Sequence, residues 1–520
     1  MRHFIPRPAA LALAAIVAAL ALSAPAPARA QGKTLRIALN QDPDILDPTL
    51  AQSYVGRIIF ANMCEKLYDL DERGQVVPQL AAALPRVSDG GRTVEIRIRS
   101  GLKFNDGTPA DAQAVKESLD RHRSLKGSNR RSELDLVTGV EVADAHTVRL
   151  KLSNPFSPLA AILADRAGML LSPAQLEKLG DKFGTHPVCV GPWSFVERVA
   201  QDRIVLEKSP YYFDPQAAQI DRLVFRIIPD DTVRLANLRS GDIDFAHLVP
   251  PTDVKALKQE PGIAVVQVPG PGYDGITINL ANKTGKHNPP QPLGTPLASS
   301  EKVREAFELS IDRDALNQAA FDGQFEPDCT PLPSLSPYHP KDFPCPKRDV
   351  ARARELLREA GFSGGVNFEL MTVNDPEQNR VAQIIQGMAS EAGITVTIRP
   401  MEFASALADQ NNGRFEAFLI GWSGRADPDA NIHQFQTCKG SLNETLACSP
   451  EIDALLNKAR EASDLRERQA LYREAIAKFT QRRNIIYLYH PTYIVAFKKS
   501  ISGYVATPDG LIRMKGVRMD

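Results

Sequence analysis

The chain has 520 residues, enough for two or three domains, and 43% of its residues are hydrophobic, as in ordinary globular proteins. Its 62 basic and 62 acidic side chains cancel. A chain without net charge gives no reason to expect nucleic acid or an anionic membrane surface as a partner, so we expect neither. Partners that are small or uncharged are favoured instead.

The N-terminus has the pattern of a secretory signal peptide. A basic segment, Arg2–Arg7, precedes an apolar stretch rich in alanine and leucine, and Pro25–Ala30 supplies an Ala-x-Ala cleavage site. We expect cleavage after Ala30, which makes Gln31 the first mature residue. No cysteine follows the apolar stretch as a lipid anchor, and no later apolar run reaches about 18 residues. The sequence therefore predicts an exported, periplasmic protein.

The mature chain alternates predicted strands with predicted helices, which favours an α/β fold. The predicted strands include Thr34–Leu39, Thr93–Arg99, His146–Leu152 and Leu223–Ile228. Apolar residues at helical spacing predict a helix within Ser53–Leu70. Further on, Asn105-Asp106-Gly107 is a tight turn, after which Thr108 is expected to cap a helix and Pro109 to occupy its first position.

Six cysteines are available for disulfides in an oxidising compartment. The pair Cys438–Cys448 brackets a polar loop and the pair Cys329–Cys345 brackets a proline-rich loop, so each pair is predicted to form a disulfide. A metal site would need tighter CxxC-type spacing with histidine partners, which neither pair has. Cys64 lies in an apolar stretch and is interpreted as a buried thiol, and the pairing of Cys189 stays open.

Several segments occur in an order that a known family shares. They are Leu46-Asp47-Pro48, Lys103–Pro109, Val190–Trp193, Ser209–Tyr212, Ser240–Asp244, Val303–Phe307, Ser310–Arg313, Leu356–Gly361 and Gly421-Trp422. On these motifs the chain resembles the extracytoplasmic solute-binding proteins of family 5, the peptide and oligopeptide binding components of ABC importers. The resemblance covers nearly all of the mature chain.

The resemblance implies a two-lobed α/β fold of the periplasmic-binding-protein type, with an extra subdomain on the first lobe and a hinge between the lobes. The first lobe would comprise residues 31–58, 187–278 and 490–520, the extra subdomain residues 59–186, and the second lobe residues 279–489. The lobes would close over a ligand bound between them. The resemblance also implies a monomer without a cofactor, which delivers a peptide or peptide-like solute to membrane permease subunits.

The stretch Phe418–Asp429 changes abruptly from an apolar run into loop residues, at one of the two tryptophans. A large ring beside fixed charges at the end of a strand is typical of a small-molecule pocket, with a packed tryptophan and a solvated turn as the alternative. Core packing is likewise the alternative for every aromatic residue considered. By family position, the expected ligand contacts are Gln52, Tyr54, Tyr273, Asp274, Gly275, Trp422, Ser423, Gly424, Arg425, Asp427 and Tyr489.

Arg425 departs from the pattern of the family's peptide binders. They place an Asp there, three residues after the tryptophan, and pair it with the amino terminus of the peptide. An unpaired buried cation is costly beside an ammonium group. Either Asp427 takes over the amine, or Arg425 binds a carboxylate or phosphate in bidentate fashion. The sequence leaves open a peptide, an anionic opine-like compound or modified amino acid, and a metal complex as ligand.

Two enzyme motifs occur as strings without the structural context that they need. Gly361–Gly365 matches GxSxG, but a helix is predicted before it and a strand after it, the reverse of a nucleophile elbow. Gly270–Gly275 matches GxGxxG, but it joins two predicted strands and is interpreted as the crossover into the second lobe. His433, near the Trp422 loop, is a weak metal ligand because the nine histidines show no HxxxH or HExxH spacing. We expect neither catalysis nor a metal site; a secreted hydrolase is the least favoured alternative.

Overall fold

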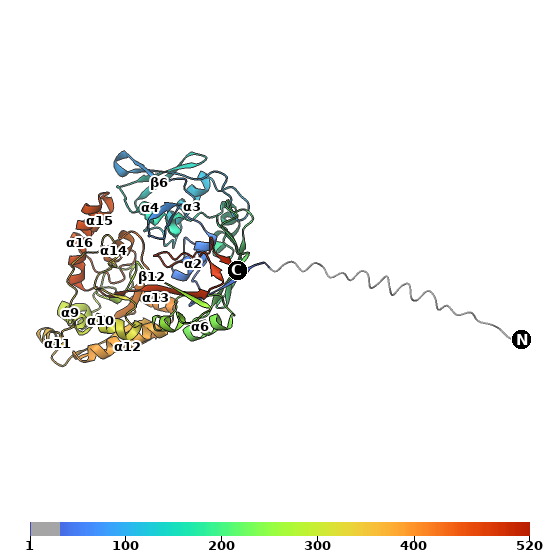
Figure 1. The fold of residues 1–520 in the computed structure, drawn as a ribbon. Coiled ribbons are helices and arrows are strands. Elements are labelled where there is room, and N and C mark those ends of the chain that lie inside the picture. The colour runs from blue at the N-terminus through green and yellow to red at the C-terminus, as the bar shows by residue number, and fades with distance from the viewer. Residues whose placement is uncertain (2–31) are drawn as a thin grey trace.

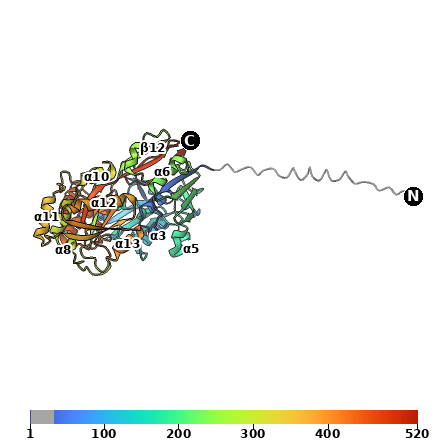
Figure 2. The same cartoon turned by 90° about the horizontal axis from the view of Figure 1, so that it is seen from below.

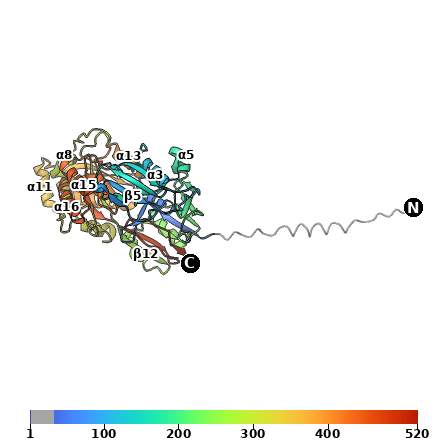
Figure 3. The ribbon, with the colours of Figure 1, turned by 90° about the horizontal axis from the view of Figure 1, so that it is seen from above.

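The computed structural model describes Met1 and residues 32–520, and the predicted signal peptide and its cleavage site lie outside that range. Two mixed α/β lobes make up the described chain, as predicted (Figure 1). Figures 2 and 3 show the same division from below and above, with α8 and α11 at the far end of one lobe and α5 on the other. Within residues 32–520, no helix has both the length and the apolar character of a membrane span.

A seven-stranded sheet forms the centre of the first lobe. Its strands, in spatial order, are β12 (Ile263–Pro269), β19 (Thr492–Lys498), β11 (Phe245–Ala246), β1 (Thr34–Leu39), β10 (Arg222–Ile227), β9 (Arg203–Lys208) and β8 (Trp193–Val199). β1 runs parallel to β10 and β11, whereas the remaining pairs are antiparallel. The strands predicted from Thr34 and Leu223 are therefore neighbours at the centre of this sheet.

The second lobe has a six-stranded sheet of its own. Its strands, in spatial order, are β14 (Glu326–Pro327), β18 (Ile485–His490), β13 (Tyr273–Ile278), β17 (Ala417–Trp422), β15 (Val366–Val373) and β16 (Ile394–Met401). The residues of β13 and β18 are almost all buried, because helices and loops cover both faces of these strands.

A third sheet, four-stranded and antiparallel, is separate from the two central sheets and has its own hydrophobic core. Its strands, in spatial order, are β4 (Arg86–Ser88), β5 (Thr93–Arg97), β7 (Thr147–Leu152) and β6 (Val137–Asp144). Two further sheets have two strands each, β2 with β3 (Tyr68–Leu70, Val76–Pro78) and β20 with β21 (Ile501–Ser502, Arg518–Met519). The alternating patterns of Thr93–Arg99 and His146–Leu152 thus correctly predicted strands with one buried face.

Helices cover the three sheets (Figure 1). Those of the first half are α2 (Tyr54–Met63), α3 (Ala112–Ser124), α4 (Leu159–Ile162), α5 (Pro173–Leu179), α6 (Asp231–Ser240) and α7 (Val254–Leu257). Those of the second half are α8 (Pro296–Ser299), α9 (Glu301–Ser310), α10 (Arg313–Phe321), α11 (Val350–Glu359), α12 (Pro376–Ser390), α13 (Phe403–Asn411), α14 (Asp429–Gln436), α15 (Pro450–Glu461) and α16 (Leu465–Arg482).

Two chain crossovers join the central sheets side by side. β12 leads through Gly270–Gly272 into β13, and β18 leads through Pro491 into β19. The side chain of His490 links the two crossovers, because its Nδ1 donates to the carbonyl oxygen of Gly272 at 2.5 Å. The GxGxxG string is therefore a crossover, as predicted. The lobe boundaries remain predictions, although β13, which precedes the expected boundary at residue 278, already pairs with β17 and β18.

The predicted cap of α3 is wrong. The helix begins after Asp111, whose side chain accepts hydrogen bonds from the backbone N–H groups of Gln113 and Ala114. Thr108 instead closes the preceding turn, because its hydroxyl donates to Asp106 at 2.6 Å. The helix is therefore capped by the carboxylate of Asp111, three residues after Thr108, which accepts hydrogen bonds from its free N–H groups.

The interpretation of Cys64 as a free thiol is also wrong, because Cys64 forms a disulfide with Cys189. The helix predicted within Ser53–Leu70 ends at Met63, directly before this cysteine. After Met63 the chain becomes extended, and Glu65 N–H donates to the carbonyl oxygen of Val190 at 2.6 Å. The two predicted disulfides, Cys329–Cys345 and Cys438–Cys448, are confirmed.

Candidate functional site

Four arginines meet where the lobes touch, three of them buried and the fourth, Arg425, with 11% of its side chain exposed, and we call them the guanidinium cluster. Its members are Arg57 in α2, Arg130 in the loop after α3, Arg166 in the 3-10 helix Arg166–Gly168, and Arg425 in the loop after β17. Arg57, Arg130 and Arg166 are each no more than 3% exposed. Charges that are buried so completely need partners nearby.

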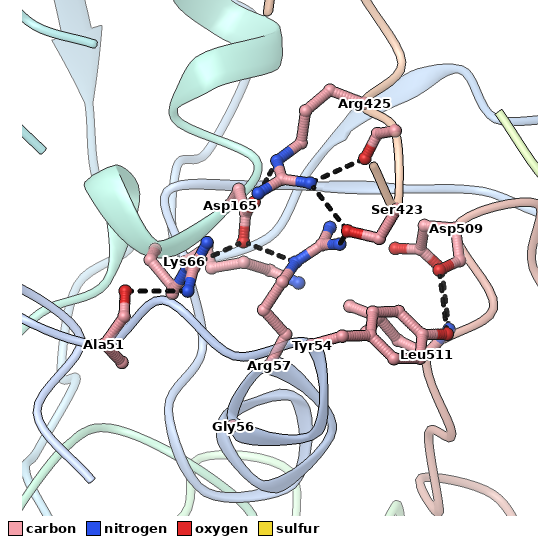
Figure 4. Close-up of polar contacts among 12 residues, drawn as sticks. Ala51, Tyr54, Gly56, Arg57, Lys66, Asp165, Ser423, Arg425, Asp509 and Leu511 are labelled. Atoms are coloured by element: carbon pink, nitrogen blue, oxygen red, sulfur yellow. Dashed lines mark hydrogen bonds and ion pairs between the residues drawn. The ribbon is translucent and has the colours of Figure 1, made fainter. Parts of the chain in front are cut away.

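Asp165 is the central partner of the cluster and joins the two lobes. Arg57 Nε lies 3.2 Å from one carboxylate oxygen of Asp165, and Arg425 Nε lies 2.7 Å from the other. Both guanidinium groups also reach Ser423, whose Oγ accepts from Arg57 at 3.4 Å and from Arg425 at 3.3 Å. Figure 4 shows the two guanidinium groups converging on Asp165, with Ser423 beside them.

The guanidinium cluster carries more positive than negative charge. Two carboxylates pair with its members within the described chain, Asp165 and Glu133, the latter 2.5 Å from Arg130. Burial opposes ionisation of Asp165, yet Arg57 and Arg425 hold the pKa of its carboxyl well below the usual range. Burial, and then the nearby Arg57, lowers the pKa of Arg425 to about 10, so that its guanidinium stays charged at neutral pH. The cluster is thus suited to an anion.

Stacked rings form a wall beside the cluster. The ring of Tyr54 stacks on that of Tyr493 at 5.4 Å and on the imidazole of His247 at 5.6 Å. The hydroxyl of Tyr493 donates to the carbonyl oxygen of Ser423 at 2.9 Å, across the boundary between the lobes. Flat aromatic surface next to fixed charge suits a small organic ligand.

The loop after β17 is held in one shape. Arg425 lies over the ring of Trp422, with its guanidinium carbon 4.4 Å from the ring centroid, in cation–π geometry. Asn431 Oδ1 accepts from the Trp422 indole at 3.0 Å and from the backbone N–H of Arg425 at 2.7 Å. Gly424 has φ 71°, and a Cβ there would lie 2.3 Å from the carbonyl carbon of Pro271, so only glycine fits.

A cavity opens beside this loop, lined in part by Glu133, Asp165, Trp422, Arg425, Asp427 and Gln434. Arg425 and Trp422 therefore line a small cavity of about 20 Å³ between segments of both lobes. A wider groove, lined in part by Arg97, Arg99 and His146, lies against the four-stranded sheet instead and has none of these residues.

Some of the predicted ligand contacts lie together at the guanidinium cluster, and others lie elsewhere. Arg425 belongs to the guanidinium cluster, and Tyr54, Trp422, Ser423 and Gly424 lie beside it. The side chain of Gln52 is exposed and donates to Asn129 at 3.2 Å. The ring of Tyr273 packs in the core, 4.7 Å from that of Tyr487.

Asp427 does not present a free carboxylate to a ligand amine. Its two oxygens accept from Arg468 at 2.9 and 2.8 Å, in a bidentate ion pair. The suggestion that Asp427 takes over the amine would require this pair to break. Asp274, Gly275 and Tyr489 lie together on β13 and β18, and the carboxylate of Asp274 accepts from Gln378 at 3.0 Å.

Sequence analysis missed Arg57 and the Asp165-Arg166 pair. Both had a signal, because each interrupts an otherwise apolar stretch, Val55–Phe60 and Leu159–Leu171. Charges inside a stretch that is destined for burial must be paired or must serve a ligand.

Comparison with known proteins points to one group. A family model described as bacterial extracellular solute-binding proteins, family 5 Middle, matches residues 75–443. A glutathione-binding protein, GsiB of Pectobacterium atrosepticum, is 30% identical over 488 residues, covering 91% of this chain and 92% of that protein. The Escherichia coli K12 protein of the same name is 29% identical over 489 residues, covering 92% and 93%.

Solved structures share the fold. The periplasmic binding protein DppA from Helicobacter pylori, in complex with the peptide STSA, superposes with a TM-score of 0.84 at 24% identity, covering 94% of this chain and 98% of that one. AgaA from A. tumefaciens R10, in complex with agropinic acid, has a TM-score of 0.83 at 24% identity, covering 94% and 99%.

Proposed function

The chain belongs to the bacterial extracellular solute-binding proteins of family 5, and from that premise we propose that it captures an anionic, peptide-like solute between its lobes for an ABC importer. The single observation that carries the anionic character is the guanidinium cluster, in which four arginines, three of them buried, face two carboxylates. A carboxylate of the ligand would supply the missing negative charge with charge-assisted hydrogen bonds.

Closure of the lobes is the proposed mechanism. Arg425 of the second lobe and Arg57 of the first both contact Asp165, so an anion bound at the same place would touch both lobes at once. Contacts that exist only when the lobes meet favour the closed state. Membrane permease subunits would recognise that state. We further propose that the protein acts as a monomer, binds no nucleic acid and performs no catalysis, since the family is one of binding proteins.

Calorimetry with glutathione as the probe tests the function. We expect one-to-one binding, and at least about tenfold weaker binding of the glutathione dimethyl ester, because esterification removes the carboxylates that the arginines would hold. Equal affinity for the acid and the ester would contradict an anion site. Mass spectrometry of the compound that co-purifies with the protein distinguishes a peptide from an opine-like ligand. The opine-like alternative is considered because the fold resembles that of a protein solved with agropinic acid.

Export is a separate prediction. We expect the periplasmic fraction to contain a mature chain that begins at Gln31, because the Ala-x-Ala site of Pro25–Ala30 precedes it. Intact-mass analysis of that fraction measures the cleavage site directly. A chain that keeps Met1 and stays in the cytoplasm would be incompatible with this prediction. Substituting Ala30 by a bulky residue provides the matched control, since it should block cleavage at the same site.

A further inference from the structure

A second charged group lies between the lobes, with the opposite sign to the guanidinium cluster. We call it the acidic cluster; its members are Asp231 at the start of α6, Asp274 in β13, and Asp375 and Glu377 at the start of α12. α6 belongs to the first lobe and the other elements to the second, and Figure 1 shows α6 next to α12.

We propose that the acidic cluster binds a cationic group, an ammonium or guanidinium, on the same solute whose anionic group the guanidinium cluster holds. This inference rests on the proposed function and narrows it, because the solute then carries both charges. A peptide with a free amino terminus has that chemistry. The amine would then be held at a different position from Arg425, where the family's peptide binders are expected to hold it.

Two of the four carboxylates have no cationic partner in the described chain. Asp375 caps α12, since its side chain accepts the backbone N–H groups of the first turn, and Asp231 pairs with Arg234. Asp274 and Glu377, in contrast, form no ion pair within 4.0 Å among residues 32–520. Asp274 is only 8% exposed. The ionised form of a buried carboxyl group is unfavourable without a cation, so such a group is protonated more readily until a ligand cation stabilises the carboxylate.

A buried hydroxyl without a partner points at the same place. Tyr489 is 2% exposed, and its hydroxyl has no hydrogen-bond partner among the described residues. Tyr489 lies opposite Asp274 in the pairing of β13 with β18. Directly opposed residues of paired strands project from the same face of a sheet, which places the Tyr489 side chain beside that of Asp274. The pKa of the Tyr489 hydroxyl agrees, because burial and then the carboxylates of Asp274 and Glu377 raise it, whereas Gln378 lowers it. A ligand ammonium has three donors, which suits a phenol oxygen and two carboxylates.

The chain leaves room for the Asp274 carboxylate. Gly421 lies opposite Asp274 in the pairing of β13 with β17, and a Cβ on Gly421 would lie 2.7 Å from Asp274 Oδ1. A larger residue at position 421 would therefore displace the carboxylate. On its other side the carboxylate is oriented by Gln378, whose Nε2 donates to it at 3.0 Å.

The two clusters lie on a common path. Tyr493 links them, because its hydroxyl donates to the carbonyl oxygen of Ser423 at 2.9 Å and its ring packs against Gly270, in the crossover that leads to Asp274, where a Cβ would lie 2.7 Å from the ring. His247, stacked on the far side of Tyr54, is fully buried, and neither of its ring nitrogens has a hydrogen-bond partner within the described chain. One ligand that extends along these rings would reach both clusters.

The geometry favours an organic cation over a metal ion. Among residues 32–520, the one group of three or more potential ligands with atoms within 4.8 Å of one another is Asp328 with Cys329 and Cys345, and its two sulfurs already form a disulfide. The acidic cluster is more widely spaced. A metal ion would need its ligands at about 2–2.6 Å, whereas an ammonium or guanidinium spans hydrogen bonds of about 2.7–2.9 Å.

The pKa values of Asp274 and Glu377 are raised, as expected for carboxyl groups without a bound cation. Burial raises the pKa of Asp274 to about 6. Burial, and then neighbouring carboxylates beginning with Asp375, raises the pKa of Glu377 to about 8. A bound cation would lower both values, so binding should release protons.

Removing only the amine of the probe tests the inference. Glutathione is compared with glutaryl-cysteinylglycine, which lacks its amino group, by calorimetry on the wild type and on Asp274→Asn. We expect the wild type to bind the analogue at least tenfold more weakly, and Asp274→Asn to bind both compounds with equal, reduced affinity. Asp314→Asn, which alters an exposed carboxylate in α10, should behave as the wild type does. Circular dichroism establishes that each variant is folded.

The pH dependence supplies a second readout. The charged and titratable groups around Asp274 and Glu377 are Asp231, Arg234, Asp375, Arg380, Tyr489, His490 and Tyr493. Between pH 5 and 7 Asp274 changes from mostly protonated to mostly ionised, whereas an α-amino group stays protonated. Affinity for glutathione should rise about tenfold over that range and affinity for the analogue should not.

Each outcome decides between the proposals. Equal affinity of the wild type for glutathione and its amine-free analogue, or no binding of either compound, would overturn the inference. In the first case the proposed function stands if the dimethyl ester still binds more weakly than the acid. Nickel(II) chloride alone is the metal control. A heat of binding that disappears in Asp274→Asn, without discrimination between the two organic probes, would assign the cluster to a metal and overturn the organic cation.

Discussion

Replacing Arg425 by alanine should weaken binding of glutathione by about 2–5 kcal/mol, which is about 30-fold to 5,000-fold in Kd. The reason is that the substitution removes one of the two guanidinium groups that reach across the boundary between the lobes, Arg425 to Asp165 and Arg57 to Ser423. Calorimetry measures the loss. Arg414→Ala is the matched control, because that side chain is 60% exposed and pairs with Asp409 on the surface.

The variant Asp165→Asn tests whether the cluster binds the ligand or only stabilises the fold. If Arg57 and Arg425 serve the ligand, Asp165 competes with the ligand for them, and Asp165→Asn should strengthen binding of the anion while it weakens the folded protein. If the cluster only stabilises the fold, Asp165→Asn should instead weaken binding, as Arg425→Ala does. Arg425→Asp should repel the anion and favour a solute with a free amine there. Unchanged affinity in Arg425→Ala would show that Arg425 serves Asp165 alone.

Much of the fold could be predicted because its signals are local. The strands at Thr34 and Thr93 follow from alternation or apolar content over a few residues, and the disulfides Cys329–Cys345 and Cys438–Cys448 from short loops that each pair brackets. The Trp422–Arg425 loop was prominent for a similar reason, since ring, glycine and charge are adjacent in sequence. These features need no knowledge of distant segments.

The rest of the site depends on contacts between distant segments. Arg57 meets Asp165 across 108 residues of sequence, and Ser423 across 366, so no spacing rule connects them. The position of Tyr273 has a different reason. Successive side chains of a strand point to opposite faces, so Tyr273 and Asp274 could not both face one site. The structure places Tyr273 in the core, whereas Asp274 contacts Gln378 on α12.

The disulfide that sequence analysis missed should matter most for stability. Cys64→Ala with Cys189→Ala should lower the free energy of unfolding by about 5 kcal/mol by chain-entropy arithmetic, because the bond closes a loop of 125 residues that includes the four-stranded sheet. The matched control, Cys438→Ala with Cys448→Ala, opens a loop of 10 residues and should cost about 3 kcal/mol.

Urea unfolding followed by tryptophan fluorescence measures both losses, because the two tryptophans report on different lobes. Trp193 begins β8 in the first lobe and is fully buried, and Trp422 ends β17 in the second. Trp193 follows Cys189 closely in the chain, so loss of the Cys64–Cys189 bond should lower the unfolding midpoint of the first lobe most. A larger loss from the 10-residue loop than from the 125-residue loop would show that native packing, and not the entropy of the unfolded chain, sets the contribution of these bonds.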